Sequence, residues 1–210
     1  MDSATNMRTG GAIPFPAYTP PGTIETPRET LLMVWGREPE FAPSLQGGVQ
    51  MVERVMAGMV DFFGKDARRI HHFLKVYGFA RGIARMEGVD GDTLRVIELA
   101  ALTHDIGIKP SEEKYGSSAG HYQEIEGPAP ARLLLREAGC KEADIERVCW
   151  LIAHHHTYSN IVGIDYQILV EADFLVNVFE DAIGPAEVAS IRDRIFKTSA
   201  GLKLLDAMYR

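Results

Sequence analysis

LAALTHDIG, residues 99–107, is an apolar stretch that ends in an adjacent histidine and aspartate, His104 and Asp105, before its final glycine. We expect a buried helix over residues 94–106, with Asp92 as its N-cap, because a helix that is apolar on all sides is buried. Burying an imidazole beside a carboxylate is costly unless both find a partner. A divalent cation would be such a partner, since both groups bind first-row metals well. The alternative is a His-Asp pair that only caps the helix end.

Apolar residues at three- and four-residue spacing predict further helices on both sides of this stretch. The predicted helices cover residues 49–63, 68–86, 130–138, 142–156, 164–180 and 186–197, with a short one closing the chain. No strand pattern or internal repeat is evident, so the fold class is expected to be all-α. Residues 48–210 are expected to form a single helical domain, because domains commonly hold about 100 to 200 residues.

Residues 107–128 are rich in glycine, serine and proline and are predicted to form a long loop. This loop leaves the helix that carries His104 and Asp105, so we expect it to border the same site. Its glycines and serines would allow it to close over a substrate. A plain surface connection is the alternative.

The N-terminal segment has a different composition, since seven of the eleven prolines precede residue 50. Residues 1–47 are therefore expected to form an extended or disordered proline-rich arm. Its aromatic residues could dock on the domain or on a second copy of the chain, which would give a homo-oligomer. A loose leader is the alternative.

Composition narrows the choice of partners and compartment. The formal net charge of -7 opposes binding to nucleic acid, but a few local cations could still serve a small phosphorylated substrate. No run approaches the roughly 18 apolar residues of a membrane span, so no membrane partner is expected. The two cysteines do not indicate a disulfide framework. We expect a cytoplasmic protein.

All seven histidines lie between residues 71 and 156, and several have acidic or apolar neighbours. The order and spacing of some of these histidines and of two aspartates resemble those of the HD-domain superfamily of metal-dependent phosphohydrolases. The signature of that superfamily is a histidine, a His-Asp pair and a distant aspartate. His72 resembles the first histidine, His104 and Asp105 resemble the pair, and Asp173 resembles the last aspartate. The resemblance covers about residues 50 to 180 and implies an HD-type helical domain.

The resemblance implies that His72, His104, Asp105 and Asp173 hold a divalent transition metal, with His104 and Asp105 at the centre of catalysis. Mixed nitrogen and oxygen ligation favours manganese, iron, cobalt, nickel or zinc over magnesium. His71 is expected to lie outside the first set of ligands, because adjacent side chains on a helix diverge by about 100°.

Two-metal members of the superfamily imply a second ion here, bound by His155, with His156 as the near alternative and His121 from the predicted loop. The alternative is that these histidines bind substrate beside a single metal. Whether the chain holds one ion or two is left open by the sequence.

The resemblance implies a metal-dependent phosphohydrolase that uses metal-activated water on a small phosphorylated substrate, a nucleotide or a related phosphoester or anhydride. Lys109, Lys114 and Arg132 are candidate phosphate contacts, although each could be a solvated surface charge. Some single-metal nucleotidases of the superfamily carry a glutamate three residues after the His-Asp pair, where this chain has Ile108. Two other functions are considered, an HD-type di-iron oxygenase and a non-catalytic metal-binding sensor.

Overall fold

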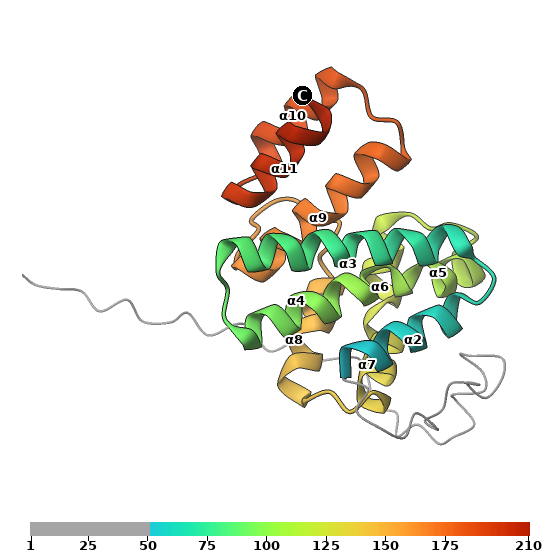
Figure 1. Cartoon of the computed structure of the whole chain (residues 1–210). Helices are drawn as coiled ribbons and strands as arrows, with labels where there is room; N and C mark the ends of the chain where they lie inside the picture. Colours follow the sequence, from blue (N-terminus) through green and yellow to red (C-terminus); the bar gives the residue numbers. More distant parts are fainter. Residues whose placement is uncertain (1–50) are drawn as a thin grey trace, which may run out of the picture.

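The computed structural model describes residues 51–210, and these residues contain helices and no strand (Figure 1). The all-α prediction is thereby confirmed for this part of the chain. The proposed arm, residues 1–47, lies outside the described residues. None of the helices in residues 51–210 is long and apolar enough to cross a membrane.

Three helices form the centre of the domain. These are α3 (Ala67–Glu87), α4 (Gly91–Thr103) and α9 (Ile164–Glu180), and each of them packs against the other two. In Figure 1, α3 runs across the middle of the molecule, with α4 below it. Leu99 and Leu102 of α4 have no exposed surface, as expected for a helix that is apolar on all sides.

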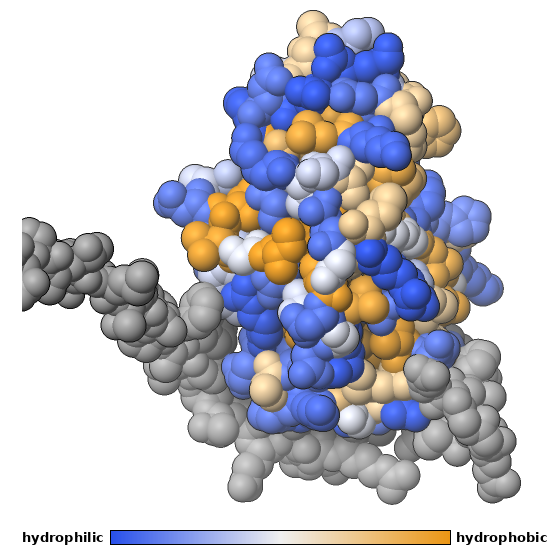
Figure 2. Space-filling view, turned by 60° about the vertical axis from the view of Figure 1, so that its left-hand side comes forward, coloured by the Kyte–Doolittle hydropathy of each residue, from blue (hydrophilic) through white to orange (hydrophobic). Residues whose placement is uncertain are grey.

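The remaining helices cover this centre. α2 (Met51–Phe63) and α8 (Glu142–Ile152) pack on α4, and α7 (Pro128–Glu137) pairs with α8. The C-terminal helices α10 (Pro185–Ile195) and α11 (Ser199–Tyr209) form a hairpin above α3 and α9 (Figure 1). On the face shown in Figure 2, apolar residues lie as islands among hydrophilic ones.

The N-cap of α4 differs from the one expected. Asp90, rather than Asp92, caps the helix, because its carboxylate accepts hydrogen bonds from the backbone amides of Asp92 at 2.9 Å and Thr93 at 3.0 Å. Both aspartates are suitable cap residues by type, and the cap position is decided by which of them keeps extended backbone angles. Asp90 does so, with ψ at 165°.

The predicted loop over residues 107–128 is wrong. The chain instead forms a short 3₁₀ turn, η1 (His104–Gly107), followed by α5 (Ile108–Tyr115) and α6 (Gly120–Glu126). Pro110 lies in the first turn of α5. The backbone N–H groups of a first turn make no hydrogen bond within the helix, so the missing N–H of proline costs nothing there. Gly116 ends α5 in the left-handed conformation, with φ at 65°. The glycines and proline therefore mark helix ends.

The predicted helix over residues 142–156 is also shorter than expected. α8 ends at Ile152, so the three consecutive histidines that follow lie in turns. Tertiary contacts hold these turns: the backbone N–H of His156 donates to the Glu124 carboxylate at 3.1 Å, and the hydroxyl of Tyr166 lies against the carbonyls of His154 and Thr157.

Glu171 fixes the C-terminal hairpin to α9. Its carboxylate is fully buried and accepts hydrogen bonds from the backbone amides of Lys197 at 2.6 Å and Thr198 at 2.9 Å, and from the Thr198 hydroxyl. Gly201 packs so closely that a Cβ at this position would lie 1.9 Å from a Glu171 oxygen. The connection between α10 and α11 is therefore tied to α9 two residues before Asp173.

Gly107, at the end of the His-Asp segment, allows α6 to approach η1. A Cβ at Gly107 would lie 2.5 Å from the carbonyl oxygen of Gln123 and 2.9 Å from its Cα. Both atoms belong to the backbone, which cannot move aside as a flexible side chain can. The approach of α6 to the His-Asp segment thus requires glycine at this position.

We expect Gly107→Ala to lower the free energy of unfolding by about 1–3 kcal/mol, the usual cost of overpacking, because α6 must shift. Gly78→Ala is the matched control: Gly78 lies within α3, and a Cβ there meets nothing within 4 Å. Alanine at that position should stabilise the protein by about 0.5–1 kcal/mol through helix propensity. Urea unfolding of both variants measures the difference, and equal stabilities would contradict the packing argument.

Candidate metal centre

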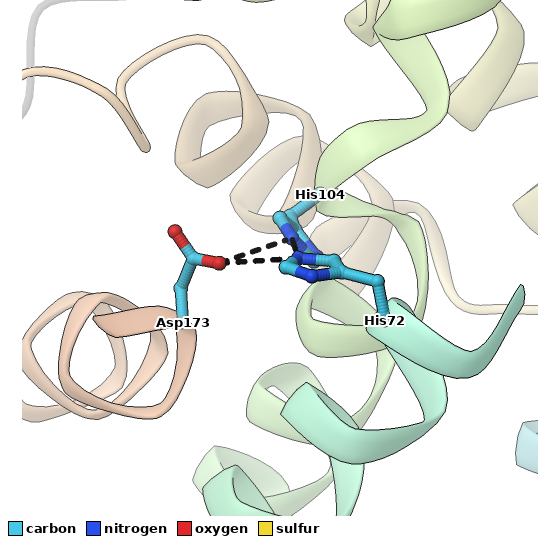
Figure 3. Close-up of side chains that lie close together, drawn as sticks. All are labelled: His72, His104 and Asp173. Atoms are coloured by element: carbon cyan, nitrogen blue, oxygen red, sulfur yellow. Dashed lines mark hydrogen bonds and ion pairs between the residues drawn. The ribbon is translucent and has the colours of Figure 1, made fainter. Parts of the chain in front are cut away.

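Four predicted ligands from three segments of the chain lie together. His72 comes from α3, His104 and Asp105 from η1 directly after α4, and Asp173 from α9. Figure 3 shows His72, His104 and Asp173 pointing toward one another. The Nε2 atoms of the two histidines are 3.3 Å apart, and Asp173 Oδ1 is 3.2 Å from the first and 3.7 Å from the second. Asp105 Oδ2 is 3.4 Å from each of them.

These separations suit a single cation. Nitrogen and oxygen ligands placed about 2.1 Å from one ion lie roughly 3.0 to 3.5 Å from each other, depending on the coordination geometry. The Nε2 atoms of His72 and His104 lie between 3.2 and 3.7 Å from each other and from the nearest oxygens of Asp105 and Asp173. The residues therefore fit a divalent metal without rearrangement of the helices.

The hydrogen bonds of the histidines orient their rings for ligation. His104 Nδ1 is 3.0 Å from the Ala101 carbonyl oxygen and His155 Nδ1 is 2.7 Å from that of Ile152. His72 Nδ1 is 3.0 Å from the Glu180 carboxylate. Because all three partners accept, each ring in its neutral form carries its hydrogen on Nδ1, which leaves the Nε2 lone pair free to bind a metal.

A second group of ligand atoms adjoins the first. Asp105, His155 and His156 each place a ligand atom within 4.8 Å of the others. Asp105 Oδ1 is 3.6 Å from His155 Nε2, while its other oxygen faces His72 and His104. The Nε2 atoms of His155 and His156 are buried without a hydrogen-bond partner among the described residues. Asp105 could thus bridge two ions.

The other histidines lie apart from these groups. His121 is exposed, lies against the neighbouring Tyr122 ring with the centroids 3.8 Å apart and the ring planes tilted by 44°, and belongs to neither group. His71 is exposed beside the buried His72. His154 stacks on Trp150 and donates to the carbonyl of that residue at 2.7 Å.

The three candidate phosphate contacts each have other partners. Lys114 pairs with Glu126 at 2.7 Å, and Arg132 pairs with Glu142 and Glu146 of α8. The Lys109 ammonium lies over the Phe62 ring, 5.4 Å from its centroid. Among residues 51–210 we find no contact that joins these cations to the four ligands. Their assignment to substrate stays a prediction.

Sequence reasoning missed two neighbours of the site, Glu180 and Tyr158. Glu180 follows Asp173 by seven residues, a spacing that returns to the same face of a helix and could have drawn attention to it. Tyr158 packs its ring on Phe174, 5.0 Å between centroids, and its hydroxyl is 3.4 Å from His156 Nδ1. Tyr158 follows the three consecutive histidines outside any helix, so no helical periodicity indicates that its side chain lies beside the site.

The charges of the site shift several pKa values. Burial lowers the pKa of His72, but the hydrogen bond to Asp173 and the charges of Asp105 and Asp173 outweigh it and raise the pKa to about 9. Burial raises the pKa of Asp173, but the hydrogen bond from His72 and nearby positive charge lower it overall. Burial lowers the pKa of His156 to about 4, so this ring is neutral at pH 7. The metal-free site therefore holds a proton between carboxylates.

Comparison with known proteins agrees with a buried His-Asp site in a helical domain. The model of the HD domain family matches residues 69–195, more than half of the chain. The chain belongs to the HD domain family. It is similar to the crystal structure of a predicted HD superfamily hydrolase from an uncultured Thermotogales bacterium, with 26% sequence identity and a TM-score of 0.56, covering 79% of this chain and 88% of that one. A search of the curated proteins gives no match.

The pH dependence of metal stabilisation tests the site directly. Since the pKa of His72 is raised from 6.5 to about 9, its proton stabilises the metal-free fold fully below pH 6.5, and this contribution is lost as the pH rises through about 9. A metal ion must displace that proton. The increase in Tm on adding Mn²⁺ should therefore grow as the pH is raised from 6.5 towards 9.

Scanning calorimetry or dye-monitored melting measures these shifts. His71→Gln, at the exposed neighbouring position, should keep the pH dependence, and His72→Gln should lose it. A metal-induced shift of the same size across the whole interval in the unaltered protein would contradict the exchange of proton for metal.

Proposed function

We propose that this chain is a metal-dependent phosphohydrolase that acts on a small phosphorylated substrate, a nucleotide or a related phosphoester or anhydride. The observation that carries the proposal is that His72, His104, Asp105 and Asp173 lie together, with the two histidine Nε2 atoms 3.2 to 3.7 Å from each other and from both carboxylates. Membership of the HD domain family and similarity to a predicted HD superfamily hydrolase support it.

A divalent ion held by these four side chains would supply Lewis acidity, which activates water and offsets the charge that develops in phosphoryl transfer. Manganese, iron, cobalt, nickel and zinc all suit the donor set of two nitrogens and two oxygens. The protein's own part is to hold the ligands in fixed tautomers, through the hydrogen bonds at Nδ1, and to keep the ligand atoms largely out of bulk water.

Two further histidines can act on substrate if a single ion is bound. Burial lowers the pKa of His155, but the nearby Asp105 carboxylate, 3.6 Å from its Nε2, outweighs it, so the pKa is raised. His155 can therefore donate a charged hydrogen bond to a phosphate oxygen. His156 is neutral, because burial and the charge of His155 lower its pKa, and can accept a proton.

The neighbourhood of Tyr158 supports a substrate with a planar ring. Tyr158 is 40% exposed, packs at a tilt against Phe174, the residue after Asp173, and contacts His156. It therefore lies beside the candidate ligands and is open to solvent. A nucleotide would place its phosphate at the metal and its base against this aromatic pair. The substrate is proposed to be a free small molecule, since the net charge of -7 disfavours nucleic acid and the proposal includes no membrane partner.

A di-iron oxygenase is the second candidate, and the position of Asp105 favours it. The two oxygens of this carboxylate face different histidines, as a bridging ligand would require, and two buried Nε2 atoms lack hydrogen-bond partners. His121, the remaining ligand expected for a second ion, is exposed and lies against the Tyr122 ring, so among residues 51–210 the second set contains only three residues. Homo-oligomer formation through residues 1–47 stays a prediction.

With manganese or iron, the protein should release phosphate or a nucleoside monophosphate from at least one member of a nucleotide panel. Asp105→Ala should remove both the bound metal and this activity, because it deletes the carboxylate whose two oxygens face His72 and His104 on one side and His155 on the other. Asp193→Ala is the matched control, since its side chain is 77% exposed on α10, and should keep both. Metal per chain is counted by elemental analysis, and circular dichroism checks the fold.

Three results would overturn the proposal. Unchanged metal content in Asp105→Ala would show that these residues are not the ligands. Two irons per chain with substrate-dependent oxygen uptake, and no phosphate release across the panel, would establish the oxygenase instead. Absence of metal in the unaltered protein under every loading condition would favour a sensor module.

Tyr158→Ala should raise KM for a nucleotide substrate roughly 5- to 100-fold, because stacking of a base on an aromatic ring contributes about 1–3 kcal/mol. The value of kcat should change little, since Tyr158 is not among the metal ligands. Tyr158→Phe keeps the ring and should retain the original KM. Steady-state kinetics on the three proteins separates the effects, and an unaltered KM in Tyr158→Ala would show that substrate binds elsewhere.

A further inference from the structure

Glu180, the last residue of α9, contacts a metal-site histidine and a lysine at once. One carboxylate oxygen is 3.0 Å from His72 Nδ1, and the other pairs with the Lys75 ammonium. The Glu180 side chain is 14% exposed, whereas that of Lys75 is 43% exposed. The contact with the histidine is therefore shielded from water, and the lysine covers it from the solvent side.

Helical spacing explains why these groups meet. Asp173 and Glu180 are seven residues apart, which returns nearly to the same face of α9, and His72 and Lys75 are neighbours three residues apart on α3. The His72 ring consequently lies between two carboxylates of one helix. Asp173 faces its Nε2 at 3.2 Å, and Glu180 faces its Nδ1 at 3.0 Å.

We propose that Glu180 is a positioning residue that prepares His72 to bind metal. By accepting the hydrogen of Nδ1, its carboxylate selects the tautomer in which Nε2 carries the lone pair, and makes that nitrogen a stronger ligand. The ion pair with Lys75 fixes the orientation of the Glu180 carboxylate, so that its second oxygen faces Nδ1 of His72. The inference rests on the proposed metal centre and adds to it a residue outside the four ligands.

His72 depends on such a side chain more than the other histidines do. His104 and His155 donate to the carbonyls of Ala101 and Ile152, which lie in the last turns of α4 and α8, where carbonyls lack helical partners. His72 lies in the first half of the 21-residue helix α3. Carbonyls in a helix interior are already paired, so its Nδ1 needs an acceptor from another element.

Without Glu180, the alternative tautomer would gain population. A hydrogen on Nε2 would point at Asp173, 3.2 Å away, and form a hydrogen bond that competes with metal binding. The ring could also rotate about its bond to the chain, since nothing else among the described residues hydrogen-bonds to Nδ1. Both effects weaken metal binding and leave the apolar core unchanged.

The test is the affinity for Mn²⁺, measured by calorimetry on the full chain. Removal of a hydrogen-bond partner of a ligating histidine typically weakens metal binding about 10- to 100-fold. We expect Glu180→Gln, which keeps a neutral acceptor, near the lower value and Glu180→Ala near the upper one. Asp181→Asn is the matched control, because it removes the same charge at the next, exposed residue, and should bind Mn²⁺ as the unaltered protein does. Lys75→Met should have a smaller effect than Glu180→Ala.

A second readout separates positioning from folding. Long-range ¹H–¹⁵N correlation spectra of the metal-free protein, recorded at a pH where His72 is neutral, should show the hydrogen of His72 on Nδ1. Glu180→Ala should shift the ring towards the tautomer with the hydrogen on Nε2, while its metal-free Tm changes little. If Glu180→Ala binds Mn²⁺ with unaltered affinity, or His72 carries its hydrogen on Nε2, the role of Glu180 is overturned. If the unaltered protein binds no divalent ion, the metal centre itself fails, and this inference fails with it.

Discussion

The structure depends on holding two carboxylates and two imidazoles together inside a helical core. Asp105 and Asp173 repel each other where little water is available to screen them. The pKa of Asp173 is nevertheless lowered overall, because the hydrogen bond from His72 and nearby positive charge outweigh burial and this repulsion. A proton on His72 offsets the repulsion in the metal-free protein, which is why its pKa rises to about 9. A divalent ion would offset it more fully. The packing of α3, α4 and α9 has to keep His72, His104, Asp105 and Asp173 in place with and without a metal ion.

Sequence reasoning predicted the ligand set because burial and charge conflict in it visibly. His104 and Asp105 follow a run of apolar residues with no surface exposure, and Asp173 lies among buried neighbours on α9. A pattern of this kind singles out His104, Asp105 and Asp173 by their own surroundings, whereas His72 was preferred to His71 only through the resemblance to the HD-domain superfamily. The helices α3 and α9 were equally well predicted, since their apolar periodicity is long and their ends carry clear signals, such as Gly88 after α3.

The errors arose where structure depends on partners distant in sequence. The glycines of residues 107–128 favour a loop by composition, but Gly107 allows the close approach of α6 to η1. Composition cannot distinguish a glycine in a loop from a glycine at a close contact between helices. The turns after Ile152 depend on Glu124 and Tyr166, which no local pattern reveals. Glu180 likewise gains its significance from Lys75 and His72, more than 100 positions earlier.

Three acidic residues of α9 show how one helix assembles the site. Glu171 and Asp173 are two residues apart and point to different sides, so Glu171 can hold the α10–α11 connection while Asp173 faces the ligands. Glu180 returns to the face of Asp173 and holds His72. A rotation of α9 would therefore disturb all three contacts together. Since the Glu171 network resists such a rotation, the C-terminal hairpin stabilises the metal centre without contributing a ligand to it.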